Sequence, residues 1–272
     1  MREDEKAVTK IFGDGLEDML STRWAGHPLY YAQEIDSTNL WAQRLSEEGQ
    51  GSGTLCVADF QTAGRGSRGR RWEEEPHLSV MMSLLLKPSF PAERASMLTL
   101  VMGMAVCKAV RSFGLDATIK WPNDVVVSKK KICGILTEMR LDGSEIRDVV
   151  IGVGINVNAR AYPPELSDKA TSLYLEAGHV FSREEVLSKV IEIFEGYEEL
   201  FEEKADLSLL KEEYESLLAN KDAPVRVLSD LPFEGVALGI DERGRLLVRK
   251  EDGSISLVGA GEVSVRGLYS YV

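Results

Sequence analysis

Four strand-like segments follow one another in the middle of the chain, with only short, turn-like sequences between them. They are Thr118–Trp121, Val125–Ser128, Ile132–Arg140 and Val149–Asn158. Strands joined by such short connections pair as antiparallel neighbours, because a parallel pair needs a long crossover connection. This stretch constrains the fold most strongly, and it predicts a sheet that contains antiparallel hairpins.

Helices and further strands are predicted on the N-terminal side of these hairpins. The strands are Leu29–Ile35, Thr54–Phe60 and Ser79–Leu86, and the helices are Leu40–Glu48 and Ala92–Phe113. The cluster Asp36–Asn39 consists of typical N-cap residues and precedes the first helix, which Gly49 ends. Because helices lie between groups of strands, we expect an α+β domain with a mixed or antiparallel sheet flanked by helices.

A different pattern begins after Pro224, where short strands alone are predicted. They are Val225–Leu228, Gly235–Asp241, Leu246–Lys250 and Ile255–Val258, with an Asp-Gly hairpin signal in Glu251–Ser254. About 50 residues of short strands indicate a small β-barrel. We therefore expect a leader with a short helix over residues 1–29, a main domain over 30–221 and a barrel over 222–272.

The formal charge of −12 is concentrated in one region of the chain. From Arg183 to Asp222 there are 5 basic and 13 acidic residues, and apolar residues recur every three or four positions. This pattern predicts an amphipathic helix with a solvated acidic face, which starts at the capping box Ser182–Glu185 and is followed by a second helix. The acidic balance argues against general nucleic-acid binding, which requires a basic surface.

The cysteines and the N-terminus bear on the compartment. Cys56, Cys107 and Cys133 form no CxxC pair and are odd in number, as expected of reduced thiols. The acidic N-terminus lacks the apolar segment of a signal peptide. The longest uncharged run, between Arg94 and Lys108, has 13 residues and is too short to cross a membrane. We therefore expect a cytoplasmic protein with no membrane partner.

The short segment Gln61–Trp72 has a charge opposite to that of the whole chain, with 4 basic residues and no acidic ones. Within it, Gly64–Gly69 matches the G-x-G-x-x-G pattern of dinucleotide-binding proteins. That interpretation fails because no helix is predicted to follow and no acidic residue stands near position 84. Arginines provide bidentate donors for phosphate or carboxylate, and glycines let the backbone approach a ligand. We interpret the segment as a mobile phosphate clamp; the alternative is a solvated surface loop.

Two further clusters combine polar or small residues with strands. The first is Lys120–Asp124, followed by the lysine run 129–131; here Asn123 and Asp124 are equally consistent with residues that merely cap a turn. The second is Gly152–Asn158, where two glycines in a strand indicate close approach by a ligand or another backbone. The sequence contains no Ser-His-Asp or Cys-His set, and its three histidines are isolated.

Taken together, these clusters resemble the motifs of the biotin protein ligases, over roughly residues 30–270. The matching segments, in family order and spacing, are Asp36–Asn39, Gln61–Gly66 with Arg70 and Trp72, Lys120–Asp124, Lys131–Leu136 and Gly152–Asn156. The resemblance implies a mixed sheet flanked by helices, as in class II synthetases and lipoate ligases, with a C-terminal SH3-like barrel. It also implies a two-step reaction. Biotin and ATP-Mg²⁺ give biotinyl-5′-adenylate, which acylates one lysine of a biotin carboxyl carrier protein, such as that of acetyl-CoA carboxylase.

The resemblance also implies roles for individual residues. Those expected to bind biotin are Ser37, Thr38, Asn39, Gln61, Arg65, Gly66, Ser67 and Lys131. Those expected to bind ATP or the adenylate are Arg68, Arg70, Trp72, Lys120, Asn123 and Asn156, with residues 170–173 near the adenine. Lys131 is expected to be the main electrostatic catalyst, with Arg65 beside it, and Asp124 to orient a base, a metal-bound water or the acceptor lysine. Phosphates and water are expected to hold most of the Mg²⁺ coordination, so no protein metal ligands are assigned.

Two departures from the family pattern matter. Many relatives carry Arg at the position of Ser67, where it is thought to retain the adenylate. In this chain either Arg68 or Arg70 retains the adenylate instead, or the adenylate is released more readily from the site.

Only 35 residues precede Asp36, and they lack a helix-turn-helix pattern, so we expect a monofunctional ligase that does not bind DNA. Homodimerisation through a sheet edge is common in the family, and the sequence leaves it open.

Two other functions compete with the ligase. One is a lipoate or octanoate ligase of the related fold, whose expected arginine pair and glycine triplet are missing here. The other is a biotin-binding module without catalytic activity, against which the presence of Lys131 and of the segment Gln61–Trp72, here called the Gly/Arg segment, argues. The barrel is compatible with closing over ATP, recruiting the carrier or buttressing the fold.

Overall fold

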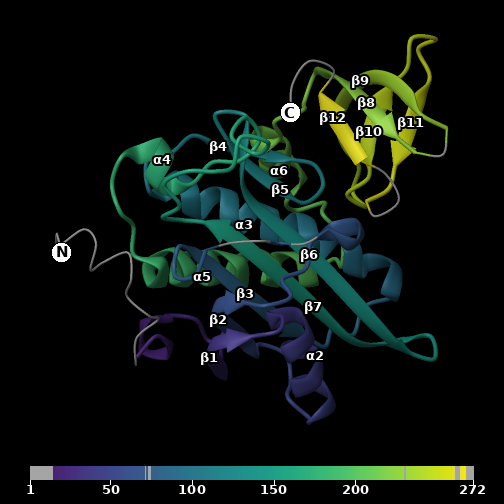
Figure 1. Ribbon diagram of the computed structural model, residues 1–272. Coiled ribbons are helices and arrows are strands. Elements are labelled where there is room, and N and C mark those ends of the chain that lie inside the picture. The colour runs from purple at the N-terminus through teal and green to yellow at the C-terminus, as the bar shows by residue number, and fades with distance from the viewer. Residues whose placement is uncertain (1–14, 71, 73–74, 230, 261–263, 268–272) are drawn as a thin grey trace.

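The computed structural model describes residues 15–70, 72, 75–229, 231–260 and 264–267 (Figure 1). Within these ranges, seven strands form one mixed sheet in the order β1-β2-β3-β7-β6-β5-β4. Their bounds are β1 Leu29–Ile35, β2 Leu55–Gln61, β3 Ser79–Leu86, β4 Ala117–Lys120, β5 Asp124–Val127, β6 Lys130–Asp142 and β7 Glu145–Asn156. The pair β1 and β2 is parallel, and the other neighbours are antiparallel. The predicted hairpins and the mixed α+β sheet are confirmed.

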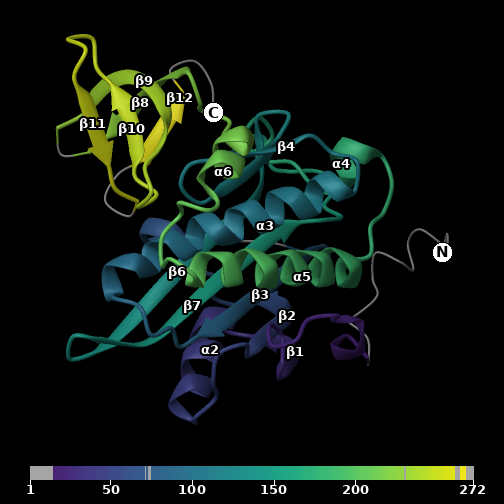
Figure 2. The same cartoon turned by 180° about the vertical axis from the view of Figure 1, so that it is seen from behind.

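Helices cover both faces of this sheet. Figure 2 shows α3 (Leu98–Ser112) and α5 (Arg183–Glu202) side by side across one face. On the other face lies α2 (Thr38–Glu47), whose Ala42 and Leu45 pack with the buried side chains of Cys56, Leu85 and Val150. The alternation of side chains along a strand explains this division, because neighbouring residues of β2 and β3 point to opposite faces. The N-terminal end of α2 is thereby brought to the middle of its face of the sheet.

The most apolar helix of the chain is α3, which continues from the 3₁₀-helix η3 (Ala92–Met97). It ends before Gly114, whose φ of +86° is a conformation that glycine adopts readily. By length and composition Ala92–Ser112 could cross a membrane, but 78% of its most apolar window is buried inside the protein. The helix is thus longer than the 13-residue uncharged run within it, it closely matches the predicted range Ala92–Phe113, and its burial identifies it as a core helix.

The acidic helix α5 is capped as predicted, since Ser182 Oγ accepts a hydrogen bond from the backbone N–H of Glu185 at 3.1 Å. Its acidic face is not wholly solvated, however. Glu195 is buried and accepts hydrogen bonds from the backbone N–H groups of Arg23, Trp24 and Ala25 at 2.9–3.0 Å. Although burial opposes ionisation, these bonds lower the pKa of Glu195 below its usual value. The carboxylate therefore ties the chain before β1 to the core.

Part of the segment predicted as a leader packs against the main domain. Leu16 and Leu20, on either side of the 3₁₀-helix η1 (Glu17–Met19), are buried in the same core as α3 and α5. The remainder of the predicted leader, residues 1–14, lies outside the described residues. The sequence pattern did not predict this packing, because the contacts are made with a helix about 170 residues further along the chain.

The C-terminal part of the described chain forms a separate five-stranded antiparallel sheet in the order β11-β10-β9-β8-β12 (Figure 1). The bounds are β8 Ala223–Leu228, β9 Phe233–Ile240, β10 Leu246–Arg249, β11 Ile255–Val258 and β12 Ser264–Gly267, the last of which was not predicted. Contacts join this sheet to the main domain: Trp121 Nε1 donates a hydrogen bond to the Gly244 carbonyl at 3.0 Å, and the Ile240 N–H donates to Glu215. Glu215 belongs to α6 (Lys211–Leu217).

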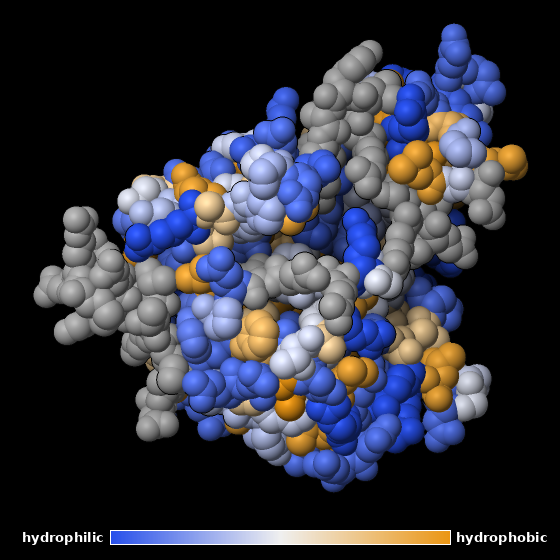
Figure 3. Space-filling view, viewed as in Figure 1, coloured by the Kyte–Doolittle hydropathy of each residue, from blue (hydrophilic) through white to orange (hydrophobic). Residues whose placement is uncertain are grey.

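The side of the molecule that carries α2 is mostly hydrophilic, with small scattered groups of hydrophobic side chains among its described residues (Figure 3). This is the surface expected for a chain with a formal charge of −12, since charged groups keep a protein surface solvated.

Candidate active site

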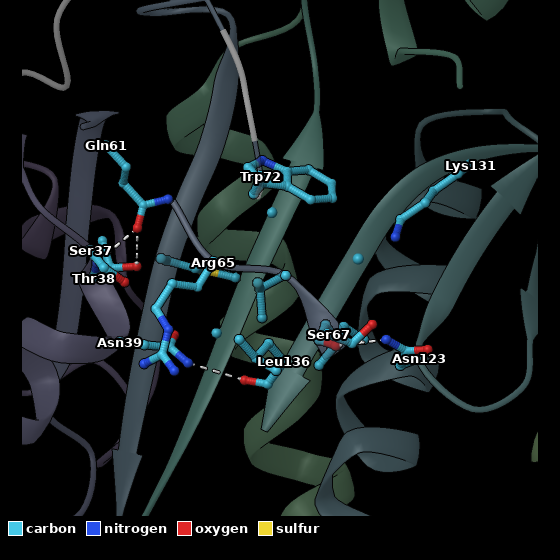
Figure 4. Close-up of a pocket in the computed structure, with 17 residues that line it drawn as sticks. Ser37, Thr38, Asn39, Gln61, Arg65, Ser67, Trp72, Asn123, Lys131 and Leu136 are labelled. Atoms are coloured by element: carbon cyan, nitrogen blue, oxygen red, sulfur yellow. Dashed lines mark hydrogen bonds between the residues drawn. The ribbon is translucent and has the colours of Figure 1, made fainter. Parts of the chain in front are cut away.

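A pocket lies on the α2 face of the main sheet, between the start of α2, the Gly/Arg segment and the strands β6 and β7 (Figure 4). Its lining residues are Ser37, Thr38, Asn39, Gln61, Arg65, Gly66, Ser67, Trp72, Met82, Asn123, Lys131, Gly134, Ile135, Leu136, Gly152, Val153 and Gly154. The cavity that they enclose has a volume of about 40 Å³. Segments from six separate parts of the sequence therefore meet at one place.

Three glycines form the floor of the pocket. Gly134 on β6 pairs with Gly154 on β7, and Gly152 lies two residues away on the same face. A Cβ atom at Gly152 would lie 2.0 Å from Asn39 Oδ1, and one at Gly154 would lie 2.5 Å from the Trp72 ring. These distances are too short for any side chain, so glycine is required where Asn39 and Trp72 approach the sheet.

The first turn of α2 carries a chain of polar contacts. Gln61 Oε1 accepts hydrogen bonds from the backbone N–H of Thr38 at 2.7 Å and from its hydroxyl at 3.1 Å. The hydroxyl of Ser83 on β3 lies 2.7 Å from Thr38 Oγ1 and 2.6 Å from Asn39 Oδ1. Apart from Gln61 these side chains are buried, so the hydrogen bonds satisfy groups that could not reach water.

Arg44 holds the residue before this turn in place. Its guanidinium donates two hydrogen bonds of 2.8 Å to the Asp36 carboxylate, which also accepts the backbone N–H of Ser37. The hydrogen bond from Arg44 is the main reason why the pKa of Asp36 is lowered. Asp36 thus supports the helix start rather than lining the pocket.

The Gly/Arg segment folds back on itself above the pocket. The Trp72 N–H donates to the Gly64 carbonyl at 3.0 Å, and the Gly66 N–H donates to the Arg70 carbonyl at 2.8 Å. The tip is the 3₁₀-helix η2 (Ser67–Gly69), and among the described residues up to β3 the G-x-G-x-x-G pattern is not followed by an α-helix of the kind that a dinucleotide fingerprint requires. This hairpin places the Trp72 ring on the glycine floor.

Two cationic groups line the pocket. Lys131 Nζ lies 2.7 Å from Asp124 Oδ1 and 5.3 Å from the centre of the Trp72 ring, an arrangement of ion pair and cation–π contact. Arg65 pairs with Glu138 on β6. Both cations therefore have a carboxylate within ion-pair distance, which holds them at the pocket wall.

The residues predicted for biotin meet at this site, since all eight of them line the pocket. Of those predicted for ATP, Trp72 and Asn123 line it as well. Arg70 folds back to donate to Ser67, and Lys120 and Asn156 are buried outside the lining. Asn156 Nδ2 donates to the Thr171 carbonyl at 2.9 Å, which brings residues 156 and 170–173 together. The side chain of Arg68 lies outside the described part of the chain.

Two polar residues of the site were not predicted from the sequence. Ser83 and Glu138 both stand in the middle of strands that were predicted, but no motif contains them. Alternation along the strands was the available signal: Gly134, Leu136 and Glu138 share one face of β6, whereas Thr137 faces α3, where its hydroxyl lies 2.7 Å from that of Thr99.

Two family models match this chain, one over the main domain and one over the C-terminal sheet. A family model described as biotin/lipoate A/B protein ligase family matches residues 31–156, and one described as biotin protein ligase C terminal domain matches residues 223–266. The chain therefore belongs to the biotin/lipoate protein ligase family, as the sequence motifs predicted.

Named relatives point to the biotin branch of this family. The bifunctional ligase/repressor BirA of Bacillus spizizenii is 38% identical over 239 residues, which are 86% of this chain and 73% of that protein. A biotin–[acetyl-CoA-carboxylase] ligase of Mycobacterium tuberculosis is 30% identical over 85% of this chain and 86% of its own length. The solved biotin protein ligase of Aquifex aeolicus, in complex with biotin and ATP, is 35% identical with a TM-score of 0.77, covering 88% of this chain and 98% of that one.

Proposed function

We propose that this chain activates biotin with ATP and transfers the biotinyl group to a lysine of a biotin carboxyl carrier protein. The observation that carries the proposal is one pocket that joins the buried polar residues at the start of α2 to the cations Lys131 and Arg65. The polar residues suit the polar ends of biotin, and the cations suit a carboxylate and a phosphate.

The first step joins two anions. A biotin carboxylate oxygen attacks the α-phosphorus of ATP, a new P–O bond forms, and the bond to pyrophosphate breaks. Fixed positive charge and in-line positioning lower this barrier, and no protein nucleophile is required. Lys131 is suited to neutralise the charge that collects on the α-phosphate, since Asp124 fixes its ammonium group at the pocket wall.

The second step consumes the mixed anhydride. The amine of the acceptor lysine attacks the acyl carbon, an amide bond forms, and AMP leaves with the electrons of the broken C–O bond. The amine must lose a proton, for which Asp124 is the carboxylate available beside Lys131. ATP is taken here as its Mg²⁺ complex, with the metal held mainly by the phosphates and water.

The loop that carries Trp72 has to move when substrates bind. Ligand pockets typically have volumes of about 300–1,000 Å³, whereas this cavity has about 40 Å³. The Trp72 ring occupies the space directly above Gly154. Movement of the Gly64–Trp72 hairpin away from the floor is the change that makes room, and its glycines permit it.

The direct test is incubation of the protein with ATP, radiolabelled biotin and a biotin carboxyl carrier domain, with pyrophosphate release as a second readout. Label on the carrier together with pyrophosphate supports the proposal. Label from lipoate or octanoate instead would favour the related ligase. Biotin binding without pyrophosphate would indicate a binding module.

A further inference from the structure

We infer that Glu138 is a positioning residue that fixes Arg65 and Asn39 together, an inference that rests on the proposed ligase activity. Glu138 belongs to no motif of the sequence. It lies on β6 with its side chain on the same face as Gly134 and Leu136, next to the pocket.

The carboxylate of Glu138 uses both of its oxygens. Oε1 lies 2.9 Å from Arg65 Nη2, and Oε2 lies 3.2 Å from Arg65 Nη1. Oε2 also accepts a hydrogen bond of 2.9 Å from Asn39 Nδ2. The side chain is 22% exposed and that of Arg65 42%, so the pair lies at the edge of the pocket and not free in solvent.

Asn39 is held in one orientation by several contacts, so Glu138 connects the loop residue Arg65 to a fixed part of the pocket. The Asn39 amide donates to the Leu136 carbonyl at 3.3 Å as well as to Glu138, and its oxygen faces Ser83. With Gly152 directly beneath it, the amide has no room to turn. In Figure 4 the side chain of Arg65 extends toward Asn39 from the Gly/Arg segment.

A continuous chain of contacts therefore runs from one side of the pocket to the other. It passes through Gln61, Thr38, Ser83, Asn39, Glu138 and Arg65. The members at its start are those proposed to bind biotin, and its end is the cation proposed to meet the carboxylate or phosphate. Glu138 connects these polar residues to Arg65, because it contacts both Asn39 and Arg65.

The pairing leaves Arg65 able to bind an anion. A guanidinium has five N–H donors, and the bidentate contact with Glu138 uses two of them. Without the carboxylate, an arginine on a glycine-rich loop samples many rotamers, and each substrate encounter must order it again. Glu138 thus sets where Arg65 stands before substrates arrive.

A double-mutant cycle on pyrophosphate release tests this role. We expect Glu138→Ala to lower kcat/KM about tenfold, the size typical of losing one charge-assisted bidentate contact, and Glu138→Gln to lower it less because the amide still accepts from Asn39. In an Arg65→Ala background, Glu138→Ala should lower kcat/KM clearly less than in the wild-type background, because only the contact with Asn39 is left to lose. Independent effects that multiply, or unchanged kinetics in Glu138→Ala, would overturn the inference. Glu138→Gln, which is nearly isosteric, serves if the alanine variant folds poorly.

A second readout does not depend on ligase activity. Trypsin cleaves after arginine, so release of Arg65 in Glu138→Gln should speed cleavage after Arg65 several-fold in the substrate-free protein. The matched control is Glu234→Gln, which removes an exposed carboxylate paired with Arg226 in the C-terminal sheet and should leave cleavage after Arg65 unchanged. Equal cleavage in Glu138→Gln and wild type would contradict the inference. Absence of pyrophosphate release from the wild-type protein would instead refute the proposed function, and the cleavage result would still decide the role of Glu138.

Discussion

Replacement of Gly152 by alanine tests whether the floor of the pocket holds the polar residues above it. The new Cβ would lie 2.0 Å from Asn39 Oδ1 and 2.8 Å from its Cγ. The backbone of β7 cannot yield easily, because Gly152 is paired with Ser83 on one side and with Leu136 on the other. The Asn39 side chain must therefore leave its position.

The expected loss follows from the hydrogen bonds that Asn39 makes. Its contact with Ser83 is neutral and contributes about 1 kcal/mol, while its bond to the charged Glu138 contributes about 1.5–3 kcal/mol. Alanine in place of glycine within a strand recovers about 0.5–1 kcal/mol. We therefore expect Gly152→Ala to lower the free energy of unfolding by about 1.5–3.5 kcal/mol, a fall in Tm of roughly 3–14 °C for a chain of this size.

Calorimetry of unfolding and titration with biotin measure the two consequences. The loss of Asn39 from its position should weaken biotin binding at least about tenfold. Gly196→Ala is the matched control: Gly196 lies within α5 with nothing within 4 Å of a new Cβ, so this variant should be slightly more stable and bind biotin normally. Wild-type Tm and biotin affinity in Gly152→Ala would show that the glycine floor does not hold Asn39 in place.

Three further predictions concern charge. Lys131→Ala should slow adenylate formation by at least about tenfold, because it removes the ammonium group that we propose neutralises the reacting anions; near-normal pyrophosphate release would exclude Lys131 as the main electrostatic catalyst. Ser67→Arg should reduce the release of free biotinyl-adenylate measured by chromatography; equal release by both proteins would dispose of the idea that Ser67 lets the intermediate leak. Burial and the neighbouring Glu202 raise the pKa of Glu198 from 4.5 to about 8. Between these pH values Glu198 is protonated in the folded state but ionised in the unfolded state. The free energy of unfolding therefore decreases as the pH rises through this range. Tm should therefore fall less steeply between pH 5 and 8 in Glu198→Gln than in the wild type, and identical slopes would contradict this origin.

Much of the fold was predictable because the main strands are apolar and bounded by turn residues. The strands over 29–35 and 79–86 have the predicted bounds, and the break in pattern after Pro224 marks the second sheet. What the pattern could not predict depends on contacts distant in sequence. The packing of residues 16–25 on α5 and the burial of Glu195 arise only when the chain is folded, since a helical wheel treats a carboxylate as solvated.

The residues of the candidate site likewise divide into those that local sequence reveals and those whose role depends on contacts distant in sequence. Arg65 could be singled out from the glycine and charge pattern of its segment, whereas Lys131 was assigned from the family resemblance; the pocket brings the two together. Glu138 and Ser83 belong to no motif, and each acquires its role from strand register, which places it on the face of the sheet beneath α2. Trp72 was assigned from the resemblance, but its place on the glycine floor depends on the hairpin of the Gly/Arg segment.

Transfer of labelled biotin to a carrier domain by the purified protein with ATP measures the proposed ligase activity itself. We expect label on one carrier lysine, one pyrophosphate released for each biotin transferred, and loss of both in Lys131→Ala. Wild-type protein that binds biotin yet releases no pyrophosphate, or that labels the carrier from lipoate and not from biotin, would contradict the proposed activity.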